Sequence, residues 1–186
     1  MTERHPHLLD ASKAALFVID VQKAFRPVMG GFEAMLAGCI RLVKTFHALD
    51  LPIFVTEQYP KGLGNTVDEL KMALGTTDVP EKTVFSAYGC TGLPELIAES
   101  QAKQIVVCGI ETHVCVNQTV HDLLADGYQV FVAVDAVESR HEMNFEWALR
   151  KMERSGASMT TSEMAAFELM KDAKHEKFKE IQSLFK

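Results

Sequence analysis

The stretch VCGIETHVCV, residues 107–116, joins an apolar run to a segment that begins like a helix. The run QIVVCG (104–109) is rich in Val and Ile, which is typical of a strand buried on both faces of a parallel sheet. Cys115 lies about one turn into the helix that we expect to begin near Thr112. Because unpaired backbone N–H groups and the helix dipole favour an anion there, we expect its thiol to ionise easily and to act as a nucleophile. An inert buried cysteine also fits this position.

Further apolar runs alternate with helical patterns along the chain. They are AALFVID (14–20), PIFVTE (52–57) and QVFVAVD (129–135), and we expect GASMTT (156–161) to be a last strand. Apolar residues recur at helical spacing between the first two runs, in residues 32–50. We expect more helices at about 66–73, 93–102, 113–126, 140–155 and 163–171. The alternation predicts an α/β fold: a three-layer, Rossmann-like, open and mostly parallel sheet with helices on both faces.

Composition limits the kinds of protein that the chain can be. A chain of 186 residues that is 47% hydrophobic and 24% charged is expected to form a single domain, residues 1–186. The net charge of -6 offers no basic face, so we expect neither nucleic acid nor a membrane as partner. The start, MTERHPHLLDASK, lacks the apolar core of a secretory signal, and the four cysteines form no CxxC pair. We therefore expect a cytoplasmic protein with reduced thiols.

Polar residues at the predicted strand ends are candidates for a site, because ligands of such sheets bind outside the carboxyl ends of the strands. These residues are Asp20, Thr56, Glu57, Gln58, the segment from Glu111 to Cys115, and Asp135. The other cysteines are expected to be inert. Cys39 falls on the apolar stripe of a helix, Cys108 lies inside a strand, and Cys90 precedes a turn.

Three alternative sites are disfavoured. A strand followed by a helix does not supply the usual ligand spacing of a zinc site, which would use Cys108, His113, Cys115 and His121. A papain-like pair of His113 with Cys115 is disfavoured, because side chains two residues apart do not face each other on a helix. His113 is then a wall of the site or a surface residue. Gly62 and Gly64 lack the context of a phosphate-binding loop, and we expect a mobile loop there.

Five segments carry a family resemblance over nearly the whole chain: LFVIDVQKAFRP (16–27), VTEQYPKGLGNTVDEL (55–70), EKTVFSAYG (81–89), CGIETHVCVNQTVHDLLADGYQVFVAVDAVESR (108–140) and SGASMTTSEMAAFELMKDAKHEKFKEIQSL (155–184). They resemble the isochorismatase-like cysteine hydrolases, and within that family the isochorismatase-domain-containing proteins. The resemblance implies a catalytic triad of Asp20, Lys82 and Cys115. It implies that Cys115 is the nucleophile, that Asp20 is the general base and later proton donor, and that Lys82 lowers the thiol pKa and holds Asp20.

The resemblance also gives a role to the turn in the opening stretch. It implies a non-proline cis peptide between Ile110 and Glu111, and an oxyanion hole formed by the backbone N–H groups of Glu111 and Cys115. The side chain of Glu111 departs from the small residues frequent at this position in the family. Its carboxylate either repels anionic substrates or points away from the site.

Two further departures narrow the reaction. Nicotinamidase-type relatives carry an Asp-x-His…His metal site after the second strand, whereas this chain has TEQYPKGLGNT, without histidine. Nicotinamide hydrolysis is therefore not expected, and we expect no metal and no cofactor. Relatives that cleave the vinyl ether of isochorismate lack the cysteine, so the presence of Cys115 disfavours that reaction.

These inferences predict a hydrolase of a small amide or related C–N substrate that acts through a thioester-type intermediate. The expected substrate pocket is partly aromatic, which favours a small neutral or aromatic substrate, and its wall consists of Phe25, Gln58, Tyr59, Phe85, Tyr88 and His113. The expected partners are this small molecule and further copies of the chain, as a dimer or higher homo-oligomer. The alternative is a ligand-binding or scaffold member of the same fold with little or no turnover.

Overall fold

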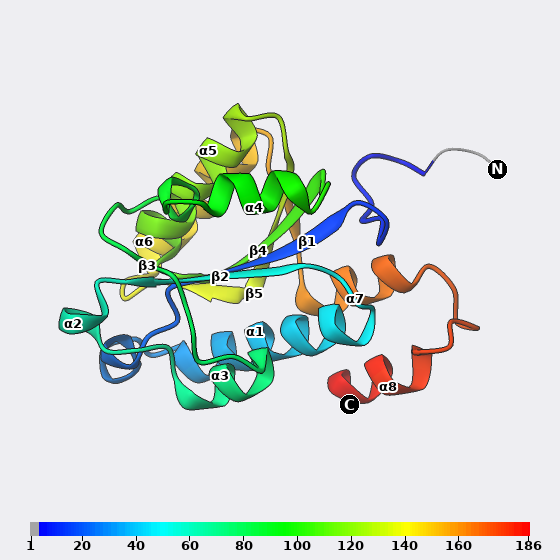
Figure 1. Ribbon diagram of the computed structural model, residues 1–186, viewed down its shortest axis with the longest axis horizontal. Coiled ribbons are helices and arrows are strands. Elements are labelled where there is room, and N and C mark those ends of the chain that lie inside the picture. The colour runs from blue at the N-terminus through cyan, green and yellow to red at the C-terminus, as the bar shows by residue number, and fades with distance from the viewer. Residues whose placement is uncertain (1–3) are drawn as a thin grey trace.

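The computed structural model describes residues 4–186, and in them six parallel strands form one open sheet (Figure 1). Along the chain the strands are β1 (Ala14–Ile19), β2 (Ile53–Gln58), β3 (Glu81–Lys82), β4 (Gln104–Ile110), β5 (Gln129–Glu138) and β6 (Ser158–Thr160). Across the sheet their order is β3-β2-β1-β4-β5-β6. The predicted α/β class is confirmed, including the short last strand.

Helices cover both faces of the sheet (Figure 1). On one face lie α4 (Leu93–Glu99), α5 (Asn117–Ala125) and α6 (Glu142–Arg154). On the other face lie α1 (Phe32–Ala48), α3 (Asp68–Leu74), α7 (Ser162–Met170) and α8 (Phe178–Gln182). Short helical turns are η1 (Lys23–Val28), α2 (Pro60–Leu63), η2 (Ala87–Gly89), η3 (Thr112–Val116) and η4 (Ser183–Phe185). None of the helices in residues 4–186 is long and apolar enough to cross a membrane.

The central strand β1 shows why the apolar runs are continuous. Leu16 and Val18 pack into the core on the α1 side, whereas Phe17 and Ile19 pack into the core under α4, α5 and α6. Successive strand side chains point to opposite faces, and here both faces are covered, so every residue of β1 is buried. The three-layer architecture follows from this two-sided burial.

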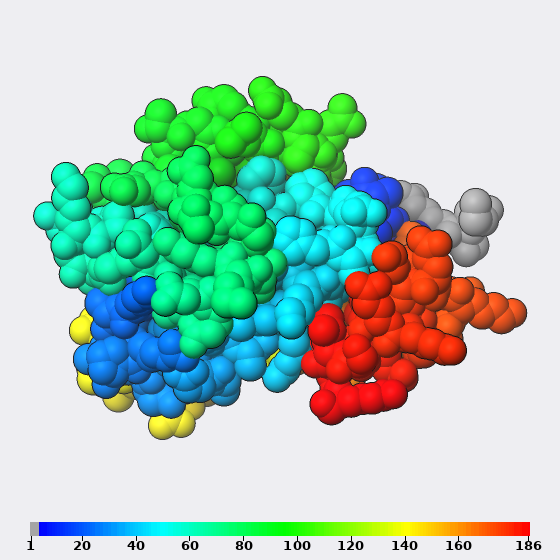
Figure 2. All heavy atoms as spheres, turned by 60° about the horizontal axis from the view of Figure 1, so that its bottom comes forward, coloured from blue at the N-terminus to red at the C-terminus, as the bar shows by residue number. Residues whose placement is uncertain are grey.

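The C-terminal segment covers one end of α1. Phe178 and Phe185 pack with Ala48 and Leu49 around the buried Ile181. Figure 2 shows this segment, in red, beside α1 in cyan. The sequence patterns did not predict α8, because a helix of five residues has too few apolar positions to show a period.

Two other segments differ from expectation. The expected loop at Gly62 and Gly64 contains the short helix α2, which begins at Pro60. Proline has no backbone N–H and a fixed φ, and both features suit the first position of a helix. Strand β3 was not predicted, because its two residues cannot show a pattern.

The strand order reverses beside β1, which pairs with β2 on one edge and with β4 on the other. Such a reversal is where open α/β sheets bind ligands. At this point β4 passes very close to β1. Gly109 has a φ of 115°, and a Cβ there would collide with the carbonyl oxygen of Ile19. Glycine is therefore required at the end of β4, just before the residues that carry the candidate site.

Candidate active site

Asp20 and Lys82 form a buried ion pair at the carboxyl end of the sheet. Lys82 Nζ lies 2.6 Å from Asp20 Oδ2, and the two side chains are 1% and 2% exposed. Asp20 directly follows β1, and Lys82 belongs to β3, two strands away. A buried ion pair needs its remaining hydrogen-bonding groups satisfied as well, because both charges have lost their hydration.

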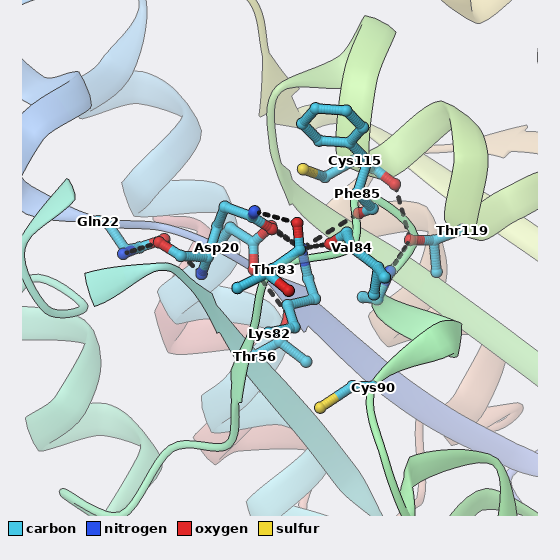
Figure 3. A network of polar contacts seen from close by, with 12 residues as sticks. Asp20, Gln22, Thr56, Lys82, Thr83, Val84, Phe85, Cys90, Cys115 and Thr119 are labelled. Carbon is cyan, nitrogen blue, oxygen red and sulfur yellow. Dashed lines mark hydrogen bonds and ion pairs between the residues drawn. The ribbon is translucent and has the colours of Figure 1, made fainter. Parts of the chain in front are cut away.

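Thr56 and the backbone hold Asp20 in place. The φ of Asp20 is 54°, in the left-handed region that aspartate tolerates better than most residues, and the chain leaves β1 there. The Asp20 N–H donates to the Thr56 carbonyl at 3.1 Å, and the Thr56 hydroxyl donates to Asp20 Oδ1 at 2.8 Å. Because Oδ2 accepts from Lys82, both carboxylate oxygens have fixed partners (Figure 3).

The Lys82 ammonium has neutral acceptors besides Asp20. Nζ donates to Gln58 Oε1 at 2.6 Å and to the carbonyl oxygens of Phe85 and Val84 at 3.1 and 3.3 Å. Gln58 is also the residue that pairs with Lys82 in the β2–β3 register. Among the described residues, four oxygen atoms thus surround the charge of Lys82. The Asp20 oxygen belongs to an anion, and the other three are neutral.

Cys115 lies in η3, the π turn between β4 and α5, and is 6% exposed. Asp20 and Lys82 lie close enough to its thiol that both shift its pKa. Thr119 fixes the turn from behind, because its hydroxyl donates to the Cys115 carbonyl at 2.6 Å and accepts the Ala87 N–H at 2.8 Å. Figure 3 shows Asp20, Lys82 and Cys115 reaching the site from three separate segments of the chain.

The expected easy ionisation of Cys115 is wrong for this site. Burial, and after it the negative charge of Asp20, raises the pKa of the Cys115 thiol from the ordinary value of 9.0 to about 12, although Lys82 acts in the opposite direction. Burial also raises the pKa of Asp20, against the lowering influence of Lys82, Thr56 and Cys115. A helix start lowers the pKa of a thiol, but here burial and the nearby negative charge of Asp20 have the larger effect. The thiol is therefore neutral at neutral pH.

The peptide bond between Ile110 and Glu111 is cis, where the family resemblance places one. Within residues 4–186, the Glu111 N–H has no backbone acceptor. A donor without a partner at this position is available to a bound ligand.

Arg140 forms hydrogen bonds and an ion pair with the Glu111 carboxylate. The Arg140 backbone N–H donates to Oε2 at 3.0 Å, and its Nε lies 3.0 Å from Oε2 and 3.1 Å from Oε1. The Glu111 side chain is 6% exposed and that of Arg140 is 50% exposed. Nearby, His113 Nδ1 lies 3.0 Å from Ser139 Oγ. These contacts tie the turn that carries Cys115 to the connection between β5 and α6, and they engage the Glu111 carboxylate with protein groups.

A groove of about 310 Å³ lies beside Lys82. It is lined by Tyr59, Glu81, Lys82, Thr83, Val84, Gly89, Cys90 and Thr91. Tyr59 lines this groove, whose lining includes neither Asp20 nor Cys115. Phe85 is the residue after Val84, and its side chain is exposed.

Phe25 and Tyr88 are not among the residues that line this groove. Phe25, in η1, packs against the core on the α1 side. The Tyr88 hydroxyl donates to the Asp126 carboxylate, and its ring makes an edge contact with Tyr128. The Tyr88 hydroxyl forms no hydrogen bond with Asp20, Lys82 or Cys115 within the described part of the chain.

Sequence reasoning missed two supporting residues, Gln22 and Thr119. Gln22 is fully buried and bonds to the backbone of Gln58, and its only sequence signal is its place two residues after Asp20.

Asp135, a strand-end candidate, accepts the Ser162 N–H at 2.7 Å and the Ser162 hydroxyl at 2.5 Å, so it supports the start of α7.

The remaining cysteines lie in buried positions. Cys39 and Cys108 are 0% exposed, and Cys39 Sγ donates to the Ala136 carbonyl. Cys90 is 4% exposed, its Sγ donates to the Glu81 carbonyl, and burial raises its pKa. In the described range, 4–186, no three His, Cys, Asp or Glu side chains are grouped so as to hold a metal ion.

Comparison with known proteins places the chain in a family. The model of the isochorismatase domain matches residues 14–164. The chain therefore belongs to the isochorismatase family.

Three relatives show how far the likeness extends. Isochorismatase domain-containing protein 2A of Mus musculus is 44% identical over 171 residues, which are 92% of this chain and 82% of that protein. The structure of MAR1 ribonuclease from Caenorhabditis elegans has a TM-score of 0.90 and 40% identity, covering 95% of this chain and 91% of that one. The YcaC gene product of Escherichia coli, described as an octameric hydrolase of unknown specificity, has a TM-score of 0.87 at 23% identity, covering 99% and 91%. This last likeness concerns the fold.

Proposed function

We propose that the protein is a cysteine-dependent hydrolase that cleaves a small amide or related C–N bond with Cys115, Asp20 and Lys82. The observation that carries the proposal is the buried Asp20–Lys82 pair, at 2.6 Å, with Cys115 close enough that both groups shift the pKa of its thiol. An anion, a cation and a nucleophile brought together in one site are what proton-coupled attack on a carbonyl carbon requires. Membership of a hydrolase family supports the same class of reaction.

In the first half-reaction, Asp20 accepts the thiol proton while the Cys115 sulfur bonds to the carbonyl carbon. Transfer of the proton during attack suits a thiol with a pKa of about 12, because no thiolate has to exist beforehand. The negative oxygen that forms is stabilised by the backbone N–H groups of Glu111 and Cys115. Asp20 then gives its proton to the nitrogen that leaves, and the acyl group stays on sulfur as a thioester.

In the second half-reaction, water attacks the thioester. Asp20 is a carboxylate again at this stage, so it accepts a proton from the water and returns it to the sulfur that leaves. Lys82 keeps Asp20 oriented throughout and stabilises negative charge on the sulfur. The products are a carboxylic acid and an amine or ammonia.

The residues around the proposed site favour a small, uncharged substrate. The groove beside Lys82 measures about 310 Å³, at the lower end of the volumes of small-molecule sites. Two sets of charged groups near the proposed reaction are paired with each other, Asp20 with Lys82 and Glu111 with Arg140, whereas Glu81 in the groove lining is exposed. The apolar groups of Tyr59 and Val84 line the groove and favour a partly apolar acyl group.

A screen for ammonia release tests the proposal. Purified protein is incubated with small amides, ureas and carbamoyl compounds, and each reaction is repeated with Cys115→Ala. Ammonia released by the wild type and not by the variant supports the proposal. Release at equal rates by both would remove Cys115 from the mechanism.

A second function is favoured by the raised pKa of Cys115. A neutral thiol at neutral pH also suits a ligand-binding or scaffold protein that keeps the fold with little turnover. Saturable binding of an amide, measured by calorimetry, with no covalent adduct and no ammonia over hours would favour this alternative.

RNA is the substrate that the name of the Caenorhabditis elegans relative raises. The net charge of -6 gives no support to phosphate-backbone binding, which depends on clustered Lys and Arg. Incubation with labelled single-stranded RNA, with Cys115→Ala as the comparison, checks this point. Cleavage by the wild type alone would contradict an amide-specific site.

We also propose that the chain forms a homo-oligomer, as the octameric YcaC relative does. Light scattering coupled to size-exclusion chromatography reports the mass directly. A mass near 20.7 kDa across micromolar concentrations would contradict this proposal.

A further inference from the structure

We infer that Gln58 is a positioning residue that holds the Lys82 ammonium through a neutral acceptor, and that Gln22 sets the position of Gln58. This inference rests on the proposed function, because it gives Gln58 a role through Lys82. The sequence predicts that Gln58 is part of the pocket wall and contacts the substrate. The role inferred here is different, because Gln58 acts on Lys82.

Both ends of the Gln58 amide are engaged by the protein. Oε1 accepts from Lys82 Nζ at 2.6 Å, and Nε2 donates to the Thr83 carbonyl at 2.9 Å. Gln58 and Lys82 are partners across the β2–β3 pair, and the next residue, Tyr59, donates its N–H to the Lys82 carbonyl at 2.9 Å. The side chain of Gln58, at the end of β2, and the backbone of the next residue thus both hold Lys82.

Gln22 fixes the backbone of Gln58 from the other side. Its Oε1 accepts the Gln58 N–H at 2.8 Å, and its Nε2 donates to the Gln58 carbonyl at 2.9 Å and to the Gly64 carbonyl at 2.6 Å. Gln22 is 0% exposed. A fully buried amide whose oxygen and nitrogen both bond to the backbone of one residue leaves that residue little freedom. Figure 3 shows Gln22 at one end of the network that contains Lys82.

The charge of the acceptor matters for the chemistry. Among the described residues, Lys82 has one anionic partner, Asp20, and its other partners are the neutral oxygens of Gln58, Val84 and Phe85. Neutral oxygens replace the hydration of a buried ammonium without cancelling its charge. The positive charge therefore continues to act on Asp20 and on the Cys115 sulfur. A second carboxylate at residue 58 would keep the hydrogen bond and cancel that charge.

Alkylation of Cys115 tests this inference without a known substrate. Iodoacetamide reacts with the folded protein at pH 9, and the label on the Cys115 peptide is quantified over time by mass spectrometry. The variants are Gln58→Met, Gln58→Glu and Lys82→Met, with Gln129→Met as the matched control, because Gln129 is exposed and lies at the start of β5. We expect Gln58→Met to slow labelling at least about threefold, Gln58→Glu to slow it as much or more, and the control to match the wild type.

The outcomes separate the inference from the proposed function. Unchanged labelling in Lys82→Met would contradict the role proposed for Lys82 itself. Slower labelling in Lys82→Met together with wild-type labelling in Gln58→Met or Gln58→Glu would overturn the inference. Once a substrate is known, Gln58→Met should lower kcat and leave KM within about twofold, whereas a residue that binds substrate would raise KM.

Discussion

The carboxylate of Glu111 receives both the backbone N–H and the Nε of Arg140, at 3.0 Å each. Glu111 is the first residue after β4, and its own N–H is a proposed oxyanion donor. Its side chain therefore ties the turn that carries Cys115 to the segment after β5. Such a tie positions a backbone donor without touching the substrate.

Removal of this tie should impair turnover more than binding. We expect Glu111→Ala to lower kcat about 10-fold to 100-fold with little change in KM, because a displaced oxyanion donor acts mainly on the transition state. Glu111→Gln keeps an acceptor for the Arg140 N–H and should lose less. Steady-state kinetics of both variants checks this, and a Glu111→Ala enzyme with wild-type kcat would show that the turn needs no such support.

Asp20→Asn should have opposite effects on alkylation and on catalysis. The negative charge of Asp20 raises the pKa of Cys115, so its removal should lower that pKa and speed labelling by iodoacetamide at pH 8. Amide hydrolysis should nevertheless slow by about 100-fold or more, because the base is lost. Asp122→Asn, on the exposed side of α5, is the matched control. Slower labelling in Asp20→Asn would contradict the assigned charge effect.

The raised pKa of Cys115 predicts how stability depends on pH. The folded-state value is about 12 and the ordinary value is 9.0, so between these pH values the unfolded chain releases a proton that the folded chain retains. The stabilising contribution of this thiol is therefore present below pH 9 and is lost as the pH rises toward 12. Wild type should lose up to about 1.4 kcal/mol per pH unit more than Cys115→Ala in that window. Parallel urea-unfolding curves at pH 8 and 10 measure the difference; equal losses would place the thiol in a more exposed environment.

Gly109→Ala should destabilise the protein strongly. The added Cβ meets the Ile19 carbonyl oxygen, and the φ of 115° is unfavourable for alanine. We expect a decrease of at least about 2 kcal/mol in the free energy of unfolding. Gly30→Ala is the control, because a Cβ at Gly30 has no atom within 4 Å. Similar stability of the two variants would contradict the close approach of β4 to β1.

The strands and most helices could be predicted from the sequence because burial on both faces makes each strand a continuous apolar run. Asp20 and Cys115 could be selected for the same reason, since each follows such a run at the carboxyl end of the sheet. Lys82 came from the family resemblance alone. Its strand has two residues and shows no pattern.

The electrostatics of the site could not be predicted from local sequence. The position of Cys115 at a helix start indicates an easily ionised thiol, but its pKa is set by burial and by Asp20, which is far away in the chain. The role of Gln22 was hidden as well, because its bonds to Gln58 exist only once β1 and β2 are side by side. The bond of Tyr88 to Asp126 could not be predicted either, because no motif indicates this partner.

The most direct test of the central claim is detection of an acyl group on Cys115. The protein is mixed with the amides that release ammonia, quenched in acid within seconds, and analysed by intact-mass and peptide mass spectrometry. The account predicts a mass increase equal to the acyl group, confined to the Cys115 peptide, absent from Cys115→Ala and reversed by hydroxylamine. Ammonia release with no adduct on Cys115 at any quench time, and with full activity in Cys115→Ala, would contradict it.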